Sequence, residues 1–352
     1  MNKLTILCYH KEKTIAMAQT STDYTYIRTQ ELPYLNHIPD DGRDIVISPY
    51  YDIVAKCFCF YIQQTDGMIF VFPSDDIDGT YLAKSSSDTN TDCKIPFLET
   101  VYRYFSFSDI LKASIDVEKD LINGLGSLHK YFVLLKYANE NNDLSGQLMI
   151  NTEIEYAFGN HRSFYDCLHK IICILLKKYR PTSPQIPDSF AKIALKSDQE
   201  LELKYLFPKP LIDFYKTRKD IFLKLREIRD NIFHHGHSPD EWSWVFSDGF
   251  AFVIDDRFAQ KLGELNLWPE SLLRPKRLGS TLAIFEFLVR DMFDAMNHLS
   301  NILVDFTSDP PFPLINDHQV FLRSSVSKHL VLLDKYRDEH WIDPRRVLGI
   351  EH

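Results

Sequence analysis

Residues 211–236 read LIDFYKTRKDIFLKLREIRDNIFHHG and predict one long helix that ends at Gly236. Pro208 and Pro210 precede the stretch, and glycine is the residue expected just past a helix C-terminus. Apolar residues recur every three or four positions, which is typical of a helix with one buried face. These residues are Leu211, Phe214, Ile221, Phe222, Leu225, Ile228 and Ile232.

Three other stretches have the same helical period, at residues 110–138, 150–179 and 280–306. Four long amphipathic helices bury their apolar stripes best against one another, so the pattern predicts an antiparallel helical bundle. Shorter helices are predicted at residues 97–107, 188–196 and 326–336.

The β-structure is expected in two places. Residues 242–254, WSWVFSDGFAFVI, predict a hairpin inserted before the last bundle helix. In the N-terminal portion, residues 53–62 and 68–72 are rich in β-branched and aromatic residues and flank a turn at Asp66-Gly67. We therefore predict a mainly α fold, an antiparallel bundle preceded by a smaller β-rich α+β portion. The expected domains are residues 1–95, 96–306 and a C-terminal extension at 307–352.

The composition limits the classes of function. Apolar residues make up 45% of the 352 residues, as in folded globular proteins, and the net charge is −9. This charge argues against a protein that coats nucleic acid through a broad basic surface, but not against an enzyme that grips one phosphate locally. The six cysteines form no CxxC pair, and no signal peptide or membrane span is evident. We expect free thiols and a cytoplasmic protein.

Arg229, Asp230 and His234 stand at the end of the predicted helix 211–235. Residues five apart on a regular helix diverge by about 140°, but the last turn can relax and bring His234 towards Arg229. A histidine near a helix C-terminus can transfer protons near neutral pH, and the planar fork of an arginine matches phosphate oxygens. These residue types can therefore supply a proton transfer and a contact to an anion.

The segment REIRDNIFHHGH, residues 226–237, resembles the motif of HEPN domains. These are helical bundles whose nuclease members carry an arginine, a polar residue, three other residues and a histidine, which Arg229, Asp230 and His234 match in order. The resemblance covers residues 110–306. It implies a metal-independent endoribonuclease that cleaves RNA through attack of the 2′-hydroxyl, and a homodimer in which two motifs form a composite site. It also implies a toxin-like or defence effector, with an antitoxin or regulator as a possible partner.

The resulting site hypothesis has catalytic residues Arg229, Asp230 and His234, and no metal or cofactor. Binding residues are predicted from the sequence that follows, and they are His235, His237, Trp242 and Trp244. His161, Arg162 and Tyr165 on the preceding long helix can also face this site.

Other interpretations of these residues stay open. Arg229 and His234 can simply end a helix, or His234, His235 and His237 can bind a metal. The aromatic rows of the hairpin can stack unpaired bases, although alternation of this kind more often packs a hairpin on a bundle. The alternative function is a catalytically inactive HEPN-like scaffold that dimerises and recognises a partner through its N-terminal portion.

Overall fold

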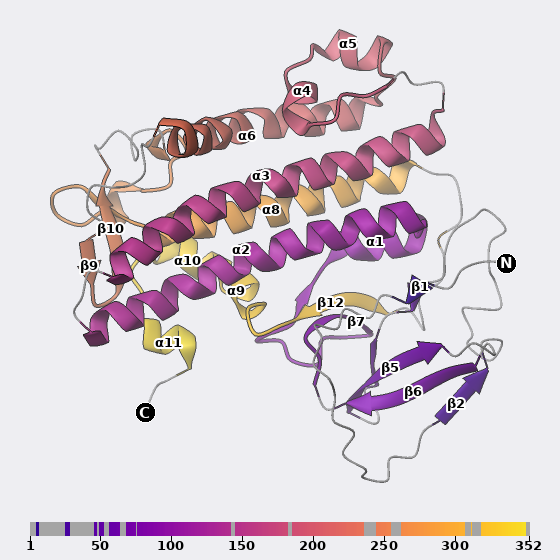
Figure 1. Cartoon of the computed structure of the whole chain (residues 1–352), viewed down its shortest axis with the longest axis horizontal. Coiled ribbons are helices and arrows are strands. Elements are labelled where there is room, and N and C mark those ends of the chain that lie inside the picture. The colour runs from indigo at the N-terminus through magenta and orange to yellow at the C-terminus, as the bar shows by residue number, and fades with distance from the viewer. Residues whose placement is uncertain are drawn as a thin grey trace. The chain divides into compact units, whose positions relative to one another are not determined.

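The computed structural model describes residues 5–6, 25–28, 46–47, 49–52, 56–63, 68–74, 76–141, 145–181, 185–235, 244–254, 262–306, 311 and 318–349. Of these, residues 5–6, 25–28, 46–47, 52, 57, 59–63, 68–73 and 231–235 are described by their backbone alone. Figure 1 shows the whole chain coloured from the N-terminus to the C-terminus. The chain divides into two units. Unit 1 comprises residues 1–114 and 299–328, and unit 2 comprises residues 115–298 and 329–352. Helices provide most of the regular structure, as the sequence predicts, and the sheets are smaller.

Unit 1 is built on a seven-stranded sheet with the strand order β2-β6-β5-β4-β7-β12-β8. The strands are β2 (Thr25–Arg28), β4 (Tyr50–Asp52), β5 (Cys57–Gln63), β6 (Met68–Ser74), β7 (Gly79–Ala83), β8 (Cys93–Lys94) and β12 (Gln319–Arg323). Strands β5 and β6 pair antiparallel, as expected, while the predicted turn at Asp66-Gly67 lies outside the described residues. Two further short strands, β1 (Thr5–Ile6) and β3 (Val46–Ile47), pair in parallel. Helix α1 (Pro96–Tyr104) follows β8.

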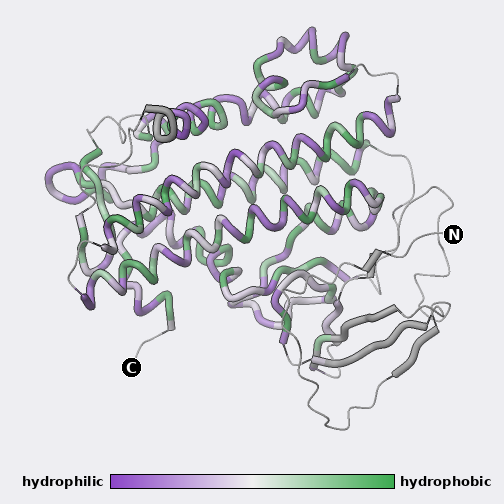
Figure 2. The backbone as a smooth tube through the Cα atoms, viewed as in Figure 1, coloured by the Kyte–Doolittle hydropathy of each residue, from purple (hydrophilic) through white to green (hydrophobic). Residues whose placement is uncertain are grey.

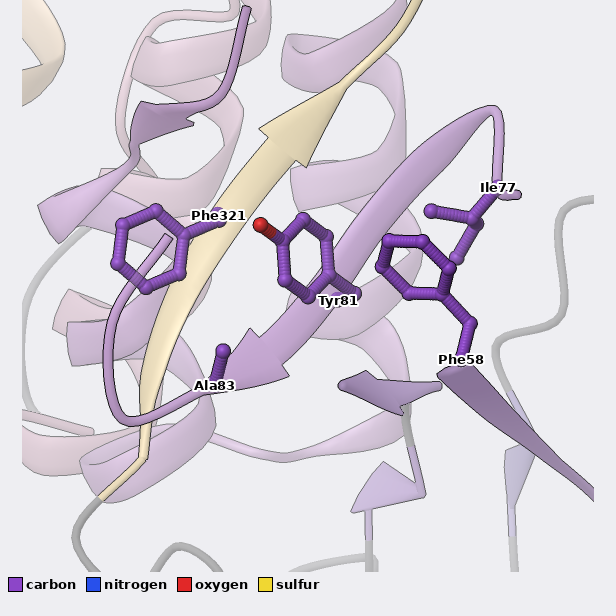
Figure 3. Packing of buried hydrophobic residues seen from close by; sticks show 5 residues of the cluster. All are labelled: Phe58, Ile77, Tyr81, Ala83 and Phe321. Carbon is purple, nitrogen blue, oxygen red and sulfur yellow. The ribbon is translucent and has the colours of Figure 1, made fainter. Parts of the chain in front are cut away.

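A cluster of buried hydrophobic residues packs around the Tyr81 ring in unit 1 (Figure 3). The Tyr81 ring lies between those of Phe58 and Phe321, with ring centroids 5.1 and 5.7 Å away. The Tyr81 hydroxyl donates to Asp92 Oδ2 at 2.5 Å, and Arg323 Nε donates to Asp92 Oδ1 at 2.7 Å. The buried Asp92 carboxylate therefore ties β12 to the segment before β8.

The strand β12 changes the expected division of the chain. It pairs antiparallel with both β7 and β8, so part of the predicted C-terminal extension belongs to the same sheet as residues 79–94. Residues 329–349 belong to unit 2 instead. Pairing between strands so distant in the sequence depends on tertiary contacts, which local periodicity does not record.

Unit 2 contains four long helices, α2 (Ser108–Asn141), α3 (Ser145–Tyr179), α6 (Lys209–His235) and α8 (Leu282–Leu303), of which α2 and α8 also contribute residues to unit 1. Neighbouring helices in this unit are antiparallel: as the residue numbers rise along one helix, the residues that they contact on the next helix fall in number. Asp116 and Ser127 of α2 contact Lys170 and Glu153 of α3, and Tyr215 and Phe222 of α6 contact His169 and Tyr165 of α3. On α8, His298 and Asp291 contact Phe214 and Arg218 of α6 in the same manner. The helices form an antiparallel bundle (Figure 1).

The helix bounds follow the apolar periods closely. Figure 2 shows hydrophobic and hydrophilic residues alternating along the bundle helices, as expected for helices with one buried face. Helix α3 begins at Ser145, five residues earlier than predicted. The stretch predicted as one helix at 326–336 forms two, α9 (Lys328–Val331) and α10 (Leu333–Asp338). The shorter helices are α4 (Phe190–Ala194), α5 (Asp198–Leu203) and α11 (Pro344–Leu348).

The predicted hairpin is present and gains a third strand. Strands β9 (Trp244–Phe246) and β10 (Gly249–Val253) pair antiparallel, and β11 (Leu278–Ser280) pairs with the other edge of β10. Phe250 and Phe252 are buried, so their role is in packing. Helix α8 begins two residues after β11. Within the described residues, no helix is both long enough and apolar enough to span a bilayer.

Candidate functional site on helix α6

The last turns of α6 carry the residues of the sequence motif. The helix continues to His235, so Arg229 and His234 lie in its C-terminal turns, as predicted. Phe222, Leu225 and Ile228 are each no more than 3% exposed and anchor this end of α6 in the bundle. Arg229 therefore stands on a helix that packing fixes in place, with 26% of its side chain exposed.

Asp230 is the centre of a cluster of arginines. Its Oδ1 accepts a hydrogen bond from Arg229 Nη1 at 2.7 Å, and its Oδ2 lies 3.4 Å from Arg226 Nε on the preceding turn. Arg162 of α3 brings its Nη1 to 4.0 Å from Asp230 Oδ1. Three guanidinium groups from two helices thus surround one carboxylate. We call Arg162, Arg226, Arg229 and Asp230 the arginine cluster.

The arginine cluster keeps Asp230 ionised. Burial acts to raise the pKa of the Asp230 carboxyl, but the hydrogen bond from Arg229 and the charges of Arg229, Arg226 and Arg162 outweigh it and lower the pKa below its ordinary value. An ionised carboxylate accepts hydrogen bonds and donates none, so Asp230 is unsuited to act as a general acid near neutral pH. Its geometry instead suits it to orient Arg229.

Arg162 and its neighbours separate into two environments. Arg162 faces the α6 residues, as the sequence suggested. Its Nε also lies 3.9 Å from Asp166 Oδ2, one turn along α3. His161 and Tyr165 are buried in the bundle and form hydrogen bonds with Asp291 of α8. Consecutive residues on a helix point about 100° apart, which places Arg162 on the open side of α3 and His161 on the buried side.

His161 and Tyr165 belong to a buried polar network around Asp291 of α8. Asp291 Oδ2 accepts hydrogen bonds from His161 Nε2 at 2.8 Å and from Tyr165 OH at 2.7 Å. Arg218 Nη1 of α6 donates to Asp291 Oδ1 at 2.9 Å. This network joins three helices of the bundle. Sequence reasoning missed it, although a single aspartate between Val289 and Met292 in an apolar stripe was a signal for a buried charge.

A second group of polar side chains surrounds His169. It contains a cysteine and a histidine, but the histidine cannot activate the cysteine as a nucleophile. The His169 Nε2–H donates to the Pro187 carbonyl at 2.7 Å, so Nδ1 accepts from Tyr215 OH at 2.6 Å. Neither nitrogen can then accept the proton of Cys173, whose Sγ lies 3.3 Å from Nε2. Burial also raises the pKa of the Cys173 thiol to about 12, so the thiol stays protonated and is a poor nucleophile.

The remaining predicted residues are placed only in part. His234 and His235 end α6, and their side chains are not described, while His237 and Trp242 lie outside the described residues. Trp244 begins β9 with 48% of its surface exposed, and Lys276 Nζ lies 6.0 Å from its ring centroid. Among the side chains that the structure describes, no group of three or more His, Cys, Asp or Glu is placed to hold a metal ion. The alternative of a metal at His234, His235 and His237 stays a prediction.

In comparison with known proteins, no family model matches this chain, and no solved structure matches its fold.

Proposed function

We propose that this protein is a metal-independent endoribonuclease of the HEPN type. The observation that supports the proposal is the joint position of Arg229, Asp230 and His234 in the last turns of one bundle helix. Asp230 restrains the Arg229 guanidinium through a 2.7 Å hydrogen bond, at a site where two more arginines gather. A pre-oriented guanidinium fits a phosphodiester, and a histidine one turn further on suits proton transfer.

The chemistry of the proposed reaction uses a nucleophile that RNA itself supplies. The 2′-hydroxyl loses its proton to a base and attacks the adjacent phosphorus, and the bond to the 5′-oxygen breaks as that oxygen takes up a proton from an acid. The products are a 2′,3′-cyclic phosphate and a 5′-hydroxyl. Arg229 stabilises the negative charge that develops on the phosphorane oxygens, and His234 performs one of the two proton transfers.

We expect the active form to be a homodimer in which two α6 helices contribute to one composite site. A single His234 supplies either the base or the acid, so a second histidine from a second copy completes the pair. Sedimentation analysis over a hundredfold range of protein concentration checks this expectation, with and without RNA. A protein that remains monomeric throughout, yet cleaves RNA at a rate proportional to its concentration, contradicts the composite site.

Cleavage is expected to proceed in excess EDTA and to leave a 2′,3′-cyclic phosphate. The reason is that arginine and histidine supply the charge and the proton transfer that a bound metal otherwise provides. End-group analysis of the digested RNA identifies the cyclic product, and a DNA strand of the same sequence, which lacks the 2′-hydroxyl, serves as the uncleaved control. Loss of activity with chelator, followed by recovery with zinc, would instead support the cluster of His234, His235 and His237.

The biological role proposed with this activity is that of a toxin-like or defence effector held in check by an antitoxin or regulator. Growth of cells that express the wild-type chain, compared with cells that express His234→Ala at equal protein level, tests the role. Arrest that depends on His234 supports it. An equal growth rate, together with RNA binding and no cleavage, would support the catalytically inactive scaffold.

A further inference from the structure

We propose that Arg162 of α3 is an RNA-binding residue of this site, which grips a phosphate beside the scissile one and contributes to substrate affinity and not to the chemical step. The inference rests on the proposed ribonuclease function and adds a residue from outside the α6 motif. It extends the substrate-binding surface from one helix to two. The substrate that fits is a single strand of RNA whose backbone crosses from α6 to α3.

The contacts of Arg162 distinguish it from the structural arginines of the same molecule. Arg323 reaches Asp92 at 2.7 Å and Arg218 reaches Asp291 at 2.9 Å, with 18% and 13% of their side chains exposed. Both make short, shielded hydrogen bonds to a buried carboxylate. These two arginines hold elements together.

Arg162 has a different environment. Its contacts with Asp166 and Asp230 are 3.9 and 4.0 Å long, beyond hydrogen-bond distance, and 35% of its side chain is exposed. Ion pairs of this length at a partly exposed position contribute little to stability. An arginine held near a carboxylate but not bonded to it can turn towards a stronger acceptor, and a phosphate offers charged oxygens that match its planar fork.

The charges beside Arg162 also suit a phosphate. The guanidinium groups of Arg162, Arg226 and Arg229 lie around the Asp230 carboxylate, and Asp166 lies beside Arg162. A cluster of cations on two helices attracts a phosphodiester by its charge.

The position of Arg162 also agrees with a contact to a neighbouring phosphate. Arg162 Nη1 and Arg229 Nη1 approach the same atom, Asp230 Oδ1, from different helices. A strand whose scissile phosphate meets Arg229 therefore passes within reach of Arg162. Because Arg162 lies on the other helix, it holds the strand in register without touching the reacting atoms.

The test measures binding separately from cleavage. A fluorescent 2′-O-methyl RNA oligonucleotide lacks the nucleophile and is not cleaved, so its Kd follows from anisotropy at several salt concentrations. Arg162→Gln is compared with the wild type and with Lys170→Gln. Lys170 is a matched control because it is also an α3 cation paired with a carboxylate at a partly exposed position, 3.4 Å from Asp116 of α2.

Arg162→Gln is expected to lower the slope of log Kd against log salt by about 0.7, the value for one phosphate contact on a single strand, and to raise Kd roughly fourfold near 0.15 M salt. Lys170→Gln should leave both quantities unchanged. Arg162→Lys keeps the charge and should retain the slope. With cleavable RNA at saturating concentration, the single-turnover rate of Arg162→Gln should equal that of the wild type.

The outcomes separate this inference from the proposed function. Wild-type binding that weakens in Arg162→Gln, without any cleavage by the wild type, supports the binding residue and contradicts the nuclease. Cleavage by the wild type with equal Kd and salt slope in Arg162→Gln overturns the inference alone. An equal loss in Lys170→Gln also overturns it, because the effect would then belong to the general charge of α3. A wild-type protein that neither binds the oligonucleotide nor cleaves RNA overturns both.

Discussion

Replacement of His234 by alanine is expected to slow RNA cleavage a hundredfold or more at saturating substrate, and replacement of Arg229 by alanine is expected to cause a loss of similar size. The histidine variant loses a proton-transfer group, an effect of roughly 10²–10⁴-fold in known enzymes. The arginine variant loses charge stabilisation of the phosphorane, which is worth roughly 10²–10³-fold per donor. Single-turnover rates measured at saturating RNA isolate these effects from binding.

Lys224→Ala is the control for the arginine variant. Lys224 is a cation of the same helix, but it pairs with Glu264 at 3.3 Å and lies outside the arginine cluster. Its loss should leave the saturated rate nearly unchanged. Cleavage that survives both His234→Ala and Arg229→Ala contradicts the proposed site, and a similar fall in all three variants points to a general loss of positive charge on α6 and not to catalysis by Arg229.

Asp291→Asn is expected to destabilise the protein by about 3–5 kcal/mol. The substitution removes the carboxylate that pairs with Arg218, whose side chain is 13% exposed, and so leaves the guanidinium with little access to solvent and without its hydrogen-bonded partner charge. It also weakens the hydrogen bonds that Asp291 accepts from His161 and Tyr165. Urea unfolding followed by circular dichroism measures the change. Asp294→Asn, on the exposed side of the same helix, is the control and should change the free energy of unfolding by less than about 0.5 kcal/mol.

The stabilisation by Asp291 should depend on pH in a defined direction. Burial acts to raise the pKa of this carboxyl, but the hydrogen bond and charge of His161, the hydrogen bond from Tyr165 and the charge of Arg218 lower it overall. The stabilisation is then complete above the unfolded pKa of about 3.9 and is lost as the pH falls through the lower folded value. The wild type should therefore lose more stability than Asp291→Asn between pH 5 and pH 2, and parallel curves for the two proteins would contradict this account.

The sequence predicted those parts of the fold that depend on local pattern. The period of apolar residues located the four bundle helices, and the paired aromatic runs located the antiparallel strand pairs β5–β6 and β9–β10. It also placed Arg229 and His234 at the end of α6. Each of these features is recorded in residues that are close together along the chain.

What the sequence did not predict depends on contacts between distant segments. The partners of β12, the approach of Arg162 to Asp230 and the convergence of His161, Arg218 and Asp291 all require the relative register of separate elements. The spacing of apolar residues predicts which face of α3 is buried, but it does not predict which residue of α6 lies opposite a given residue of α3. The third strand β11 was missed because LGS is short and two of its three residues have low strand propensity.

The position of β12 has a consequence for how the chain is made. In the sheet, β12 lies between β7 and β8, and the described residues of β8 pair with no other strand. Residues 319–323 leave the ribosome long after residues 79–94, because all four bundle helices are translated in between. Domains generally fold in the order in which they are synthesised, but this sheet must wait for its last strand. A truncated chain that ends before residue 319 therefore contains all four bundle helices but lacks a central strand of the seven-stranded sheet.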